Sequence, residues 1–227
     1  MRGNNKLLTA HMIVKNEEQW VWYAIQSILP YVECFLIFDT GSTDDTVRII
    51  KTIKDKKISF EEVGAVDANG LVKLRNKQIN KTITPWFVVV DGDEVWREEY
   101  LKNIREQLPR LNRKIIAGFV RTNNCVGDVW HILPESAGQY KIAGRIGHLN
   151  IRFFRRDPNY KWRGTYPLEA YSDLQGNKVN DNPDKLHFFN VAYWHMTHMP
   201  RSRVRESETV ARRGKKKFEF GIKIDKN

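Results

Sequence analysis

Hydrophobic positions in the first half of the chain fall into two alternating patterns. Continuous apolar runs predict four buried strands, at residues 7–14, 35–38, 59–63 and 86–90. Apolar residues three or four positions apart predict helices between these runs, over 17–29, 47–53 and 71–79. Strands that alternate with helices indicate βαβ units, so we expect an α/β fold with a Rossmann-like, mostly parallel sheet flanked by helices.

The second half of the chain has a less regular pattern. Strands are predicted at 115–120, 151–154 and 187–195, and the stretch at 123–148, rich in glycine, polar and aromatic residues, predicts a long loop or lid. A charged segment at 202–217, nearly free of helix breakers, predicts a helix in the C-terminal tail.

Polar side chains follow three of the four predicted strands of the first half. Asn16 and Glu17 come after the first strand, Asp39 ends the second, and Asp91 and Asp93 follow the fourth. Ligands of open parallel sheets bind beyond the carboxyl ends of the strands. These residues are therefore expected to gather along one edge and to form a binding site.

The segment DGDE at 91–94 carries the clearest chemical signal. Three carboxylates in four positions repel one another unless a cation neutralises them. Carboxylate oxygens suit Mg²⁺ or Mn²⁺, and Gly92 between the two aspartates would let the backbone approach a ligand closely. An isolated Asp-x-Asp is most often a solvated acidic turn, but its place after a buried strand favours a ligand site.

Four short segments, in matching order and spacing, resemble glycosyltransferase family 2, a large family with the GT-A fold. They are MIVKNEE at 12–18, DTGSTDDT at 39–46, RN at 75–76 and DGDE at 91–94, and the resemblance covers roughly residues 7–96. It implies a nucleotide-diphosphate-sugar donor, a divalent cation (Mn²⁺ or Mg²⁺) and a transfer that usually inverts the anomeric carbon.

The resemblance also assigns donor-binding residues. It implies that Asn16, Glu17 and Asp39 line the pocket for base and ribose, and that Arg75 approaches the diphosphate or the sugar. On the residues alone, Asn16 could be a helix N-cap and Arg75 a solvated helix charge. Ser42 and Asp45 resemble a capping box, and Asp44 and Asp45 are expected at the start of a helix, so these two aspartates are left out of the site.

The metal ligands implied by the resemblance come from two separate segments of the chain, one after the fourth predicted strand and one near residue 195. Asp91 would face the ribose and the waters of the metal, and Asp93 would ligate it. Members of this fold often add a C-terminal histidine, for which His195 and His198 are both candidates; by themselves they would be read as core or surface histidines.

The catalytic base is assigned to Glu169. The family often carries a His-Glu pair after an aromatic-glycine stretch, and here WRGTYPLE at 162–169 resembles that region with Leu168 in place of the histidine. Arg163 would hold Glu169 ionised, as a general base must be. The alternative is an ordinary surface glutamate.

Charge and composition extend the interpretation without choosing a partner. The chain has a net charge of +11, concentrated in a basic tail at 201–227, which suits an anionic membrane, nucleic acid or a phosphorylated substrate. We expect a catalytic domain at 1–200, with a donor half at 1–96 and an acceptor half at 97–200. Two cysteines and no apolar run of membrane-spanning length predict a cytoplasmic protein, with a peripheral position at the inner face of a membrane as the alternative.

Other classes of function receive less support. Nucleotidyltransferases share a similar sheet but typically have a glycine-rich loop where this chain has KNEE, and no G-x-G-x-x-G follows the first strand as in Rossmann oxidoreductases. No nucleic-acid-binding motif accompanies the basic charge. The acceptor is left open: a glycan, a lipid-linked sugar, a protein or another hydroxyl compound.

Overall fold

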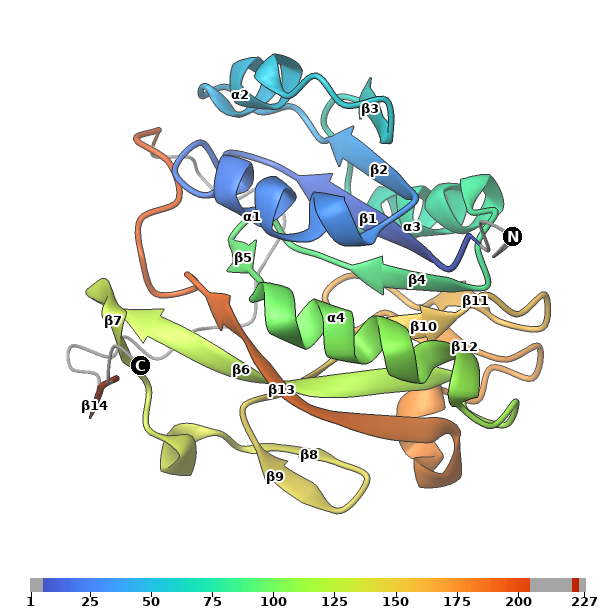
Figure 1. Ribbon diagram of the computed structural model, residues 1–227. Coiled ribbons are helices and arrows are strands. Elements are labelled where there is room, and N and C mark those ends of the chain that lie inside the picture. The colour runs from blue at the N-terminus through green and yellow to red at the C-terminus, as the bar shows by residue number, and fades with distance from the viewer. Residues whose placement is uncertain (1–5, 205–221, 225–227) are drawn as a thin grey trace, which may run out of the picture.

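A ten-stranded mixed sheet runs through the protein, with helices on both faces (Figure 1). The computed structural model describes residues 6–204 and 222–224. Its helices are α1 (Val21–Ile28), α2 (Thr46–Thr52), α3 (Ala68–Lys81) and α4 (Glu98–Gln107). The strands of the large sheet are β1 (Leu8–Val14), β2 (Cys34–Asp39), β3 (Ile58–Glu62), β4 (Trp86–Val89), β5 (Glu94–Val95), β6 (Ala117–Val126), β7 (Asp128–Ile132), β10 (Leu149–Arg155), β13 (Leu186–His195) and β14 (Ile222–Lys223). Two hairpins lie outside it, formed by β8 (Tyr140–Ile142) with β9 (Arg145–Gly147) and by β11 (Lys161–Arg163) with β12 (Ala170–Ser172).

The first half of the sheet is parallel, as its continuous apolar runs predicted. β1 lies between β2 and β4, and β3 pairs with the outer side of β2. Apolar residues of α1, α2 and α4 pack in one core cluster on one face, while those of α3 pack with β11 and β12 in a second cluster. The carboxyl ends of β1, β2 and β4 therefore meet at one edge, and the predicted α/β class is confirmed.

Two local predictions about helix starts differ from the structure. The helix expected from residue 17 begins at Val21, because 17–20 form the loop that leads out of β1. The capping box at Ser42 and Asp45 is not formed. Ser42 instead donates its hydroxyl to Asp39, so the side chain organises the turn rather than capping α2.

The second half departs further from the sequence pattern. Residues 123–148 do not form one long loop, because β6 continues to Val126 and β7, β8 and β9 follow. Short strands rich in glycine and polar residues carry little apolar periodicity, which is why the pattern missed them. In the sheet, β10 is antiparallel to β4 and β6, whereas β13 is parallel to β6.

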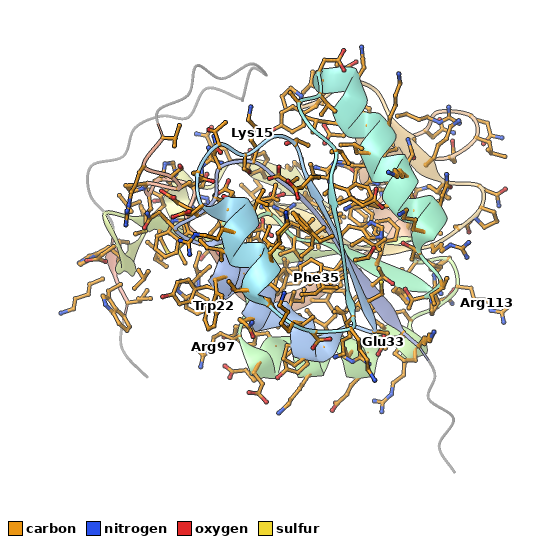
Figure 2. The ribbon with its side chains drawn as sticks, turned by 90° about the horizontal axis from the view of Figure 1, so that it is seen from above. Lys15, Trp22, Glu33, Phe35, Arg97 and Arg113 are labelled. Atoms are coloured by element: carbon orange, nitrogen blue, oxygen red, sulfur yellow. The ribbon has the colours of Figure 1, made fainter. Side chains whose placement is uncertain are left out.

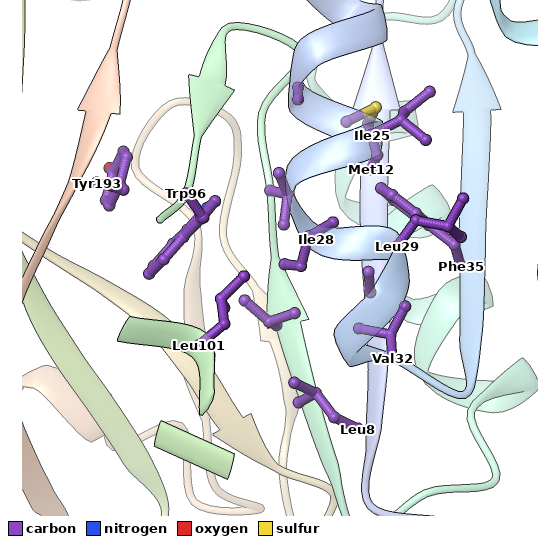
Figure 3. Close-up of a cluster of buried hydrophobic side chains, with 14 of the residues drawn as sticks. Leu8, Met12, Ile25, Ile28, Leu29, Val32, Phe35, Trp96, Leu101 and Tyr193 are labelled. Carbon is purple, nitrogen blue, oxygen red and sulfur yellow. The ribbon is translucent and has the colours of Figure 1, made fainter. Parts of the chain in front are cut away.

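One core connects the two halves (Figure 3). Met12 of β1 and Ile25 of α1 lie in the same buried cluster as Leu101 of α4. Trp96 stacks on Tyr193 of β13 with ring centroids 4.7 Å apart. This contact and the pairing of β13 with β5 hold the end of β13 beside the residues that follow β4.

The start of the basic tail packs against the first half. Trp20 donates its indole N–H to the carbonyl of Pro200 at 2.7 Å, and the backbone N–H of Gln19 donates to the carbonyl of Arg201 at 3.1 Å. Residues 202–204 are not helical, and the rest of the helix expected at 202–217 lies outside the described residues. Within the described ranges, no helix is long and apolar enough to cross a membrane.

Candidate active site

A cleft of about 1170 Å³ opens at the carboxyl ends of the parallel strands. Figure 2 shows Lys15, just after β1, at this end, and Glu33, just before β2, at the opposite end. All the predicted site residues except Asp39 line the cleft: Asn16, Glu17, Arg75, Asp91, Asp93, Glu169, His195 and His198. Residues far apart in the sequence are thus brought to one edge, as the strand-end rule predicted.

Asn16 fastens the loop after β1 to the loop after β2. Its side-chain oxygen accepts from the backbone N–H of Thr43 at 2.8 Å, and the backbone N–H of Asn16 donates to the Ser42 hydroxyl at 2.9 Å. Asn16 has a φ of +53°, a conformation that asparagine tolerates better than most residues. It is not the N-cap of α1, which is Trp20. The side-chain amide nitrogen of Asn16, Nδ2, is buried without a hydrogen-bond partner among the described residues.

Asp39 shapes the second loop from beneath the cleft. One carboxylate oxygen accepts from the backbone N–H groups of Gly41 at 2.9 Å and Ser42 at 3.0 Å, and the other accepts from the Ser42 hydroxyl. The residue is buried and does not line the cleft. In this structure, its carboxylate holds the turn that contacts Asn16.

Glu17 is a buried carboxylate in the loop that follows β1. Arg201 donates to one of its oxygens at 2.8 Å, and the other oxygen is buried without a partner in the described chain. Burial and the neighbouring Asp93 raise the pKa of Glu17 well above its ordinary value, against the opposing effect of Arg201. A Cβ on Gly92 would lie 2.8 Å from the Cγ of Glu17, so Gly92 makes room for Glu17 rather than for a ligand.

Asp93 and His195 face each other at the centre of the cleft. The Nε2 atom of His195 lies 3.4 Å from a carboxylate oxygen of Asp93, and both side chains are largely buried. Burial alone would lower the pKa of His195, but the Asp93 carboxylate outweighs it and raises that pKa above its ordinary value. The antiparallel pairing of β13 with β5 sets His195 opposite Glu94 and so places it here.

Asp91, Glu94 and His195 also form a compact group, with one ligand atom of each within 4.8 Å of the others. Glu94 is fully buried, and both its oxygens are engaged, one by Arg152 and the other by the backbone N–H of Asp91 at 3.3 Å. Burial raises the pKa of Glu94 to about 8, in spite of Arg152. Asp91 is more open, with 39% of its side chain exposed, and is therefore better placed than Glu94 to reach a ligand.

Arg152 is a site residue that the sequence analysis missed. It lies on β10 and donates to a carboxylate oxygen of Asp91 at 2.9 Å. Burial alone would raise the pKa of Asp91, but Arg152 outweighs it and holds that pKa below its ordinary value. The available signal was an arginine inside the short apolar strand predicted at 151–154, which is an expensive residue to bury without a partner.

The two candidate histidines differ in position. His195 ends β13 beside the carboxylates, whereas His198 lies three residues beyond the end of that strand. Both line the cleft, but His198 is not part of the compact group around Asp91.

Arg75 and Glu169 form an ion pair in the lining of the cleft. The Nε of Arg75 lies 3.0 Å from one oxygen of Glu169, and the Arg75 guanidinium lies 5.1 Å from the ring centroid of Trp162. The other oxygen of Glu169 is buried without a hydrogen-bond partner among the described residues. Asn76 fixes the geometry, because its amide exchanges hydrogen bonds of 2.9 and 3.0 Å with the backbone of Trp162.

The expected pairing of Arg163 with Glu169 is wrong. Arg163 donates instead to the carbonyl of Asp173 at 3.1 Å. Alternate residues of a strand point to opposite faces, and Trp162 turns inward on β11, so Arg163 points away from the site. The ion pair that the sequence analysis gave to Arg163 is made by Arg75.

The sheet, the cleft and its acidic centre are those of a GT-A-type glycosyltransferase. A sequence model described as glycosyl transferase family 2 matches residues 9–169, which is more than half of the chain, so the protein belongs to this family.

Two similar proteins each match less than half of this chain. An uncharacterized glycosyltransferase of Rickettsia typhi is 30% identical over 94 residues, which are 41% of this chain and 30% of that protein. The SPbeta prophage-derived glycosyltransferase SunS of Bacillus subtilis is 28% identical over 99 residues, 43% of this chain and 22% of SunS. Each match spans less than a third of the relative's length.

Solved structures share the fold at low identity. The crystal structure of S. aureus TarS matches with a TM-score of 0.57 and 14% identity, over 85% of this chain and 37% of TarS. A shorter form of TarS in complex with UDP-GlcNAc matches with a TM-score of 0.55 and 15% identity, over 92% of this chain and 60% of that one.

Proposed function

We propose that the protein transfers a sugar from a nucleoside-diphosphate donor to an acceptor hydroxyl, with inversion at the anomeric carbon. The observation that carries the proposal is the meeting of two groups in one cleft: Asp91, Asp93 and His195 on one side, and a buried, half-paired Glu169 on the other. Membership of the glycosyltransferase family and the likeness to a UDP-GlcNAc-bound structure support a nucleotide-sugar donor, with UDP-sugars as the first to test.

The residues present suit a divalent cation. Asp93, His195 and the exposed part of Asp91 offer carboxylate oxygens and an imidazole nitrogen. Mn²⁺ accepts such a mixed set readily, whereas Mg²⁺ favours oxygen ligands, so we propose Mn²⁺ first and Mg²⁺ second. His198 lines the same cleft and is a further candidate ligand. When bound, the cation would offset the negative charge of the departing nucleoside diphosphate.

Glu169 is the proposed general base. Its free oxygen would take the proton of the acceptor hydroxyl while the hydroxyl oxygen bonds to the anomeric carbon and the bond to the diphosphate oxygen breaks. Arg75 would orient Glu169 through their ion pair, and its position in the cleft also suits contact with the diphosphate or the sugar. Attack from the side opposite the leaving group gives inversion in one displacement.

The donor pocket is proposed to use the two loops after β1 and β2. Asn16 and Glu17 have buried polar atoms without partners in the described chain, and such atoms are suited to a base or ribose. Asp39 would support the pocket indirectly, because its carboxylate is hydrogen-bonded to the turn that contacts Asn16.

The remaining proposals concern the organisation of the chain and its surroundings. We propose a catalytic domain at 1–200, whose donor half is 1–96 and acceptor half 97–200, and a basic tail at 201–227 that contacts an anionic membrane or an anionic acceptor. The protein would then work in the cytoplasm, at times on the inner face of a membrane. Arg201 belongs to the site as well as to the tail, because it pairs with Glu17.

A donor panel tests the proposed function. Thermal unfolding and calorimetric binding would be measured with UDP-glucose, UDP-GlcNAc, other nucleotide-sugars and ATP, each with and without Mn²⁺. A donor that binds the folded protein raises its apparent stability by mass action. We expect at least one nucleotide-sugar to bind more tightly with Mn²⁺ and to be hydrolysed slowly. Binding of no nucleotide-sugar, with or without Mn²⁺, would contradict the proposal.

A further inference from the structure

Arg152 lies at an irregularity of β10. The register of β10 with β6 pairs Ile151 with Phe119 and Phe153 with Gly118, so Arg152 is an extra residue between two consecutive pairs. Such a β-bulge bends the strand and re-aims a side chain. Here it directs the guanidinium to the residues that follow β4, with only 12% of the side chain exposed.

The guanidinium connects two carboxylates. One terminal nitrogen, Nη2, donates both to Asp91, at 2.9 Å, and to Glu94. Asp91 therefore has one oxygen held by Arg152. Glu94, which is fully buried, is the second carboxyl partner of the arginine, so the buried guanidinium faces two acidic side chains.

A second set of contacts fixes the arginine itself. Its Nε donates to the hydroxyl of Tyr193 at 3.2 Å, and Asn150 donates to the same hydroxyl at 2.7 Å. The Tyr193 ring is fully buried and stacks on Trp96. The guanidinium is thus held from two sides, by Tyr193 and by Glu94, before any ligand arrives.

We infer that Arg152 is a positioning residue for Asp91, carried on the β10 bulge and balanced by Glu94. It would hold one oxygen of Asp91 so that the other faces the cation and the donor. The inference rests on the proposed function, because it assumes that a cation binds at Asp91, Asp93 and His195. It also excludes Glu94 as a ligand, since both Glu94 oxygens are already engaged.

The test must separate position from charge. Removal of Arg152 alone would make the site more negative, which favours cation binding and opposes the loss of positioning. Arg152→Lys keeps the charge but lacks the planar fork that joins two carboxylates. The double variant Arg152→Met with Glu94→Gln removes both members of the pair, so that neither is left buried without its partner. A second Arg-to-Lys change on the same strand, Arg155→Lys, is the matched control, because Arg155 bonds backbone carbonyls away from the cleft.

Mn²⁺ affinity would be measured by calorimetry on the full chain without donor, with circular dichroism and thermal midpoints as folding controls. We expect both Arg152 variants to bind Mn²⁺ about tenfold or more weakly, the usual loss when a residue that orients a metal ligand is changed. Arg155→Lys should bind as the wild type does. Wild-type affinity in both folded Arg152 variants would overturn the inference and leave the proposed function standing. A wild-type protein that binds no Mn²⁺ would overturn the proposed metal site, and the inference with it.

Discussion

Glu169 and Arg75, 94 positions apart in the chain, share one hydrogen bond of 3.0 Å in the lining of the cleft. Only one Glu169 oxygen takes part, and the second is buried without a partner in the described chain. A carboxylate that is oriented through one oxygen and keeps the other available is suited to accept a proton.

Glu169→Gln should therefore lower kcat by about 10²- to 10⁴-fold, the usual effect of removing a general base, while nucleotide affinity changes little. The glutamine keeps the shape and a hydrogen-bonding oxygen but not the basicity. Asp173→Asn is the control, because Asp173 is a partly exposed carboxylate outside the cleft lining whose oxygens accept from its own turn. Steady-state kinetics would decide, and retention of more than about a tenth of wild-type kcat would exclude Glu169 as the base.

Asp93→Asn should abolish Mn²⁺-dependent donor binding and leave the fold intact. Its carboxylate faces His195 in the cleft, and an amide is a poor ligand for a divalent cation compared with a carboxylate. Calorimetric titration with Mn²⁺, then with a nucleotide-sugar, would measure the loss. Asp128→Asn, on β7 outside the cleft lining, should behave as the wild type does. Activity near wild type in excess Mn²⁺ would remove Asp93 from the ligand set.

The donor half could be predicted from the sequence because its signals are local. Apolar runs defined β1, β2, β3 and β4, and the polar residues after them reached one edge by the rule for parallel strands. The acceptor half depends on long-range pairing, which leaves little periodicity. The role of Arg152 depends on a register shift in β10, and that of Arg75 on contacts with Trp162 and Glu169. No spacing in the chain specifies these contacts.

The basic tail can be tested without disturbing the donor site if the cut is placed correctly. A cut before residue 201 would remove Arg201, which donates to Glu17, whereas a chain ending at Val204 keeps this pair. We expect the chain ending at Val204 to bind nucleotide as the full chain does and to lose salt-sensitive association with anionic vesicles. Co-sedimentation with phosphatidylserine vesicles at low and high salt would measure it. Equal association of the two folded proteins would show that the tail is not the membrane contact.

His11 should make the stability depend on pH. It is buried, with its Nε2 atom 2.6 Å from the Thr82 hydroxyl and its ring stacked on Phe87. Burial lowers its pKa from 6.5 to about 3. The unfolded chain therefore binds a proton that the native state excludes. The free energy of unfolding should be highest above pH 6.5 and should fall by up to about 1.4 kcal/mol per pH unit as the pH drops towards 3.

His11→Asn should lower stability at neutral pH and remove this part of the slope, because asparagine does not titrate. Urea unfolding of both proteins at several pH values between 6.5 and 4 would give the difference in slope directly. Parallel curves for the two proteins would mean that His11 is protonated in the native state or is not buried as described.

The pairing of Arg201 with Glu17, 184 positions apart, has a consequence for the newly made protein. Domains fold largely from the N-terminus during synthesis, so β1 to β4 can pair while the rest of the chain is still being translated. His195 and Arg201 reach the cleft only after nearly the whole described chain has been made. A nascent chain without these residues would therefore hold an acidic, incomplete pocket, and binding competence would come with residues 195–201 rather than with the first half of the sheet.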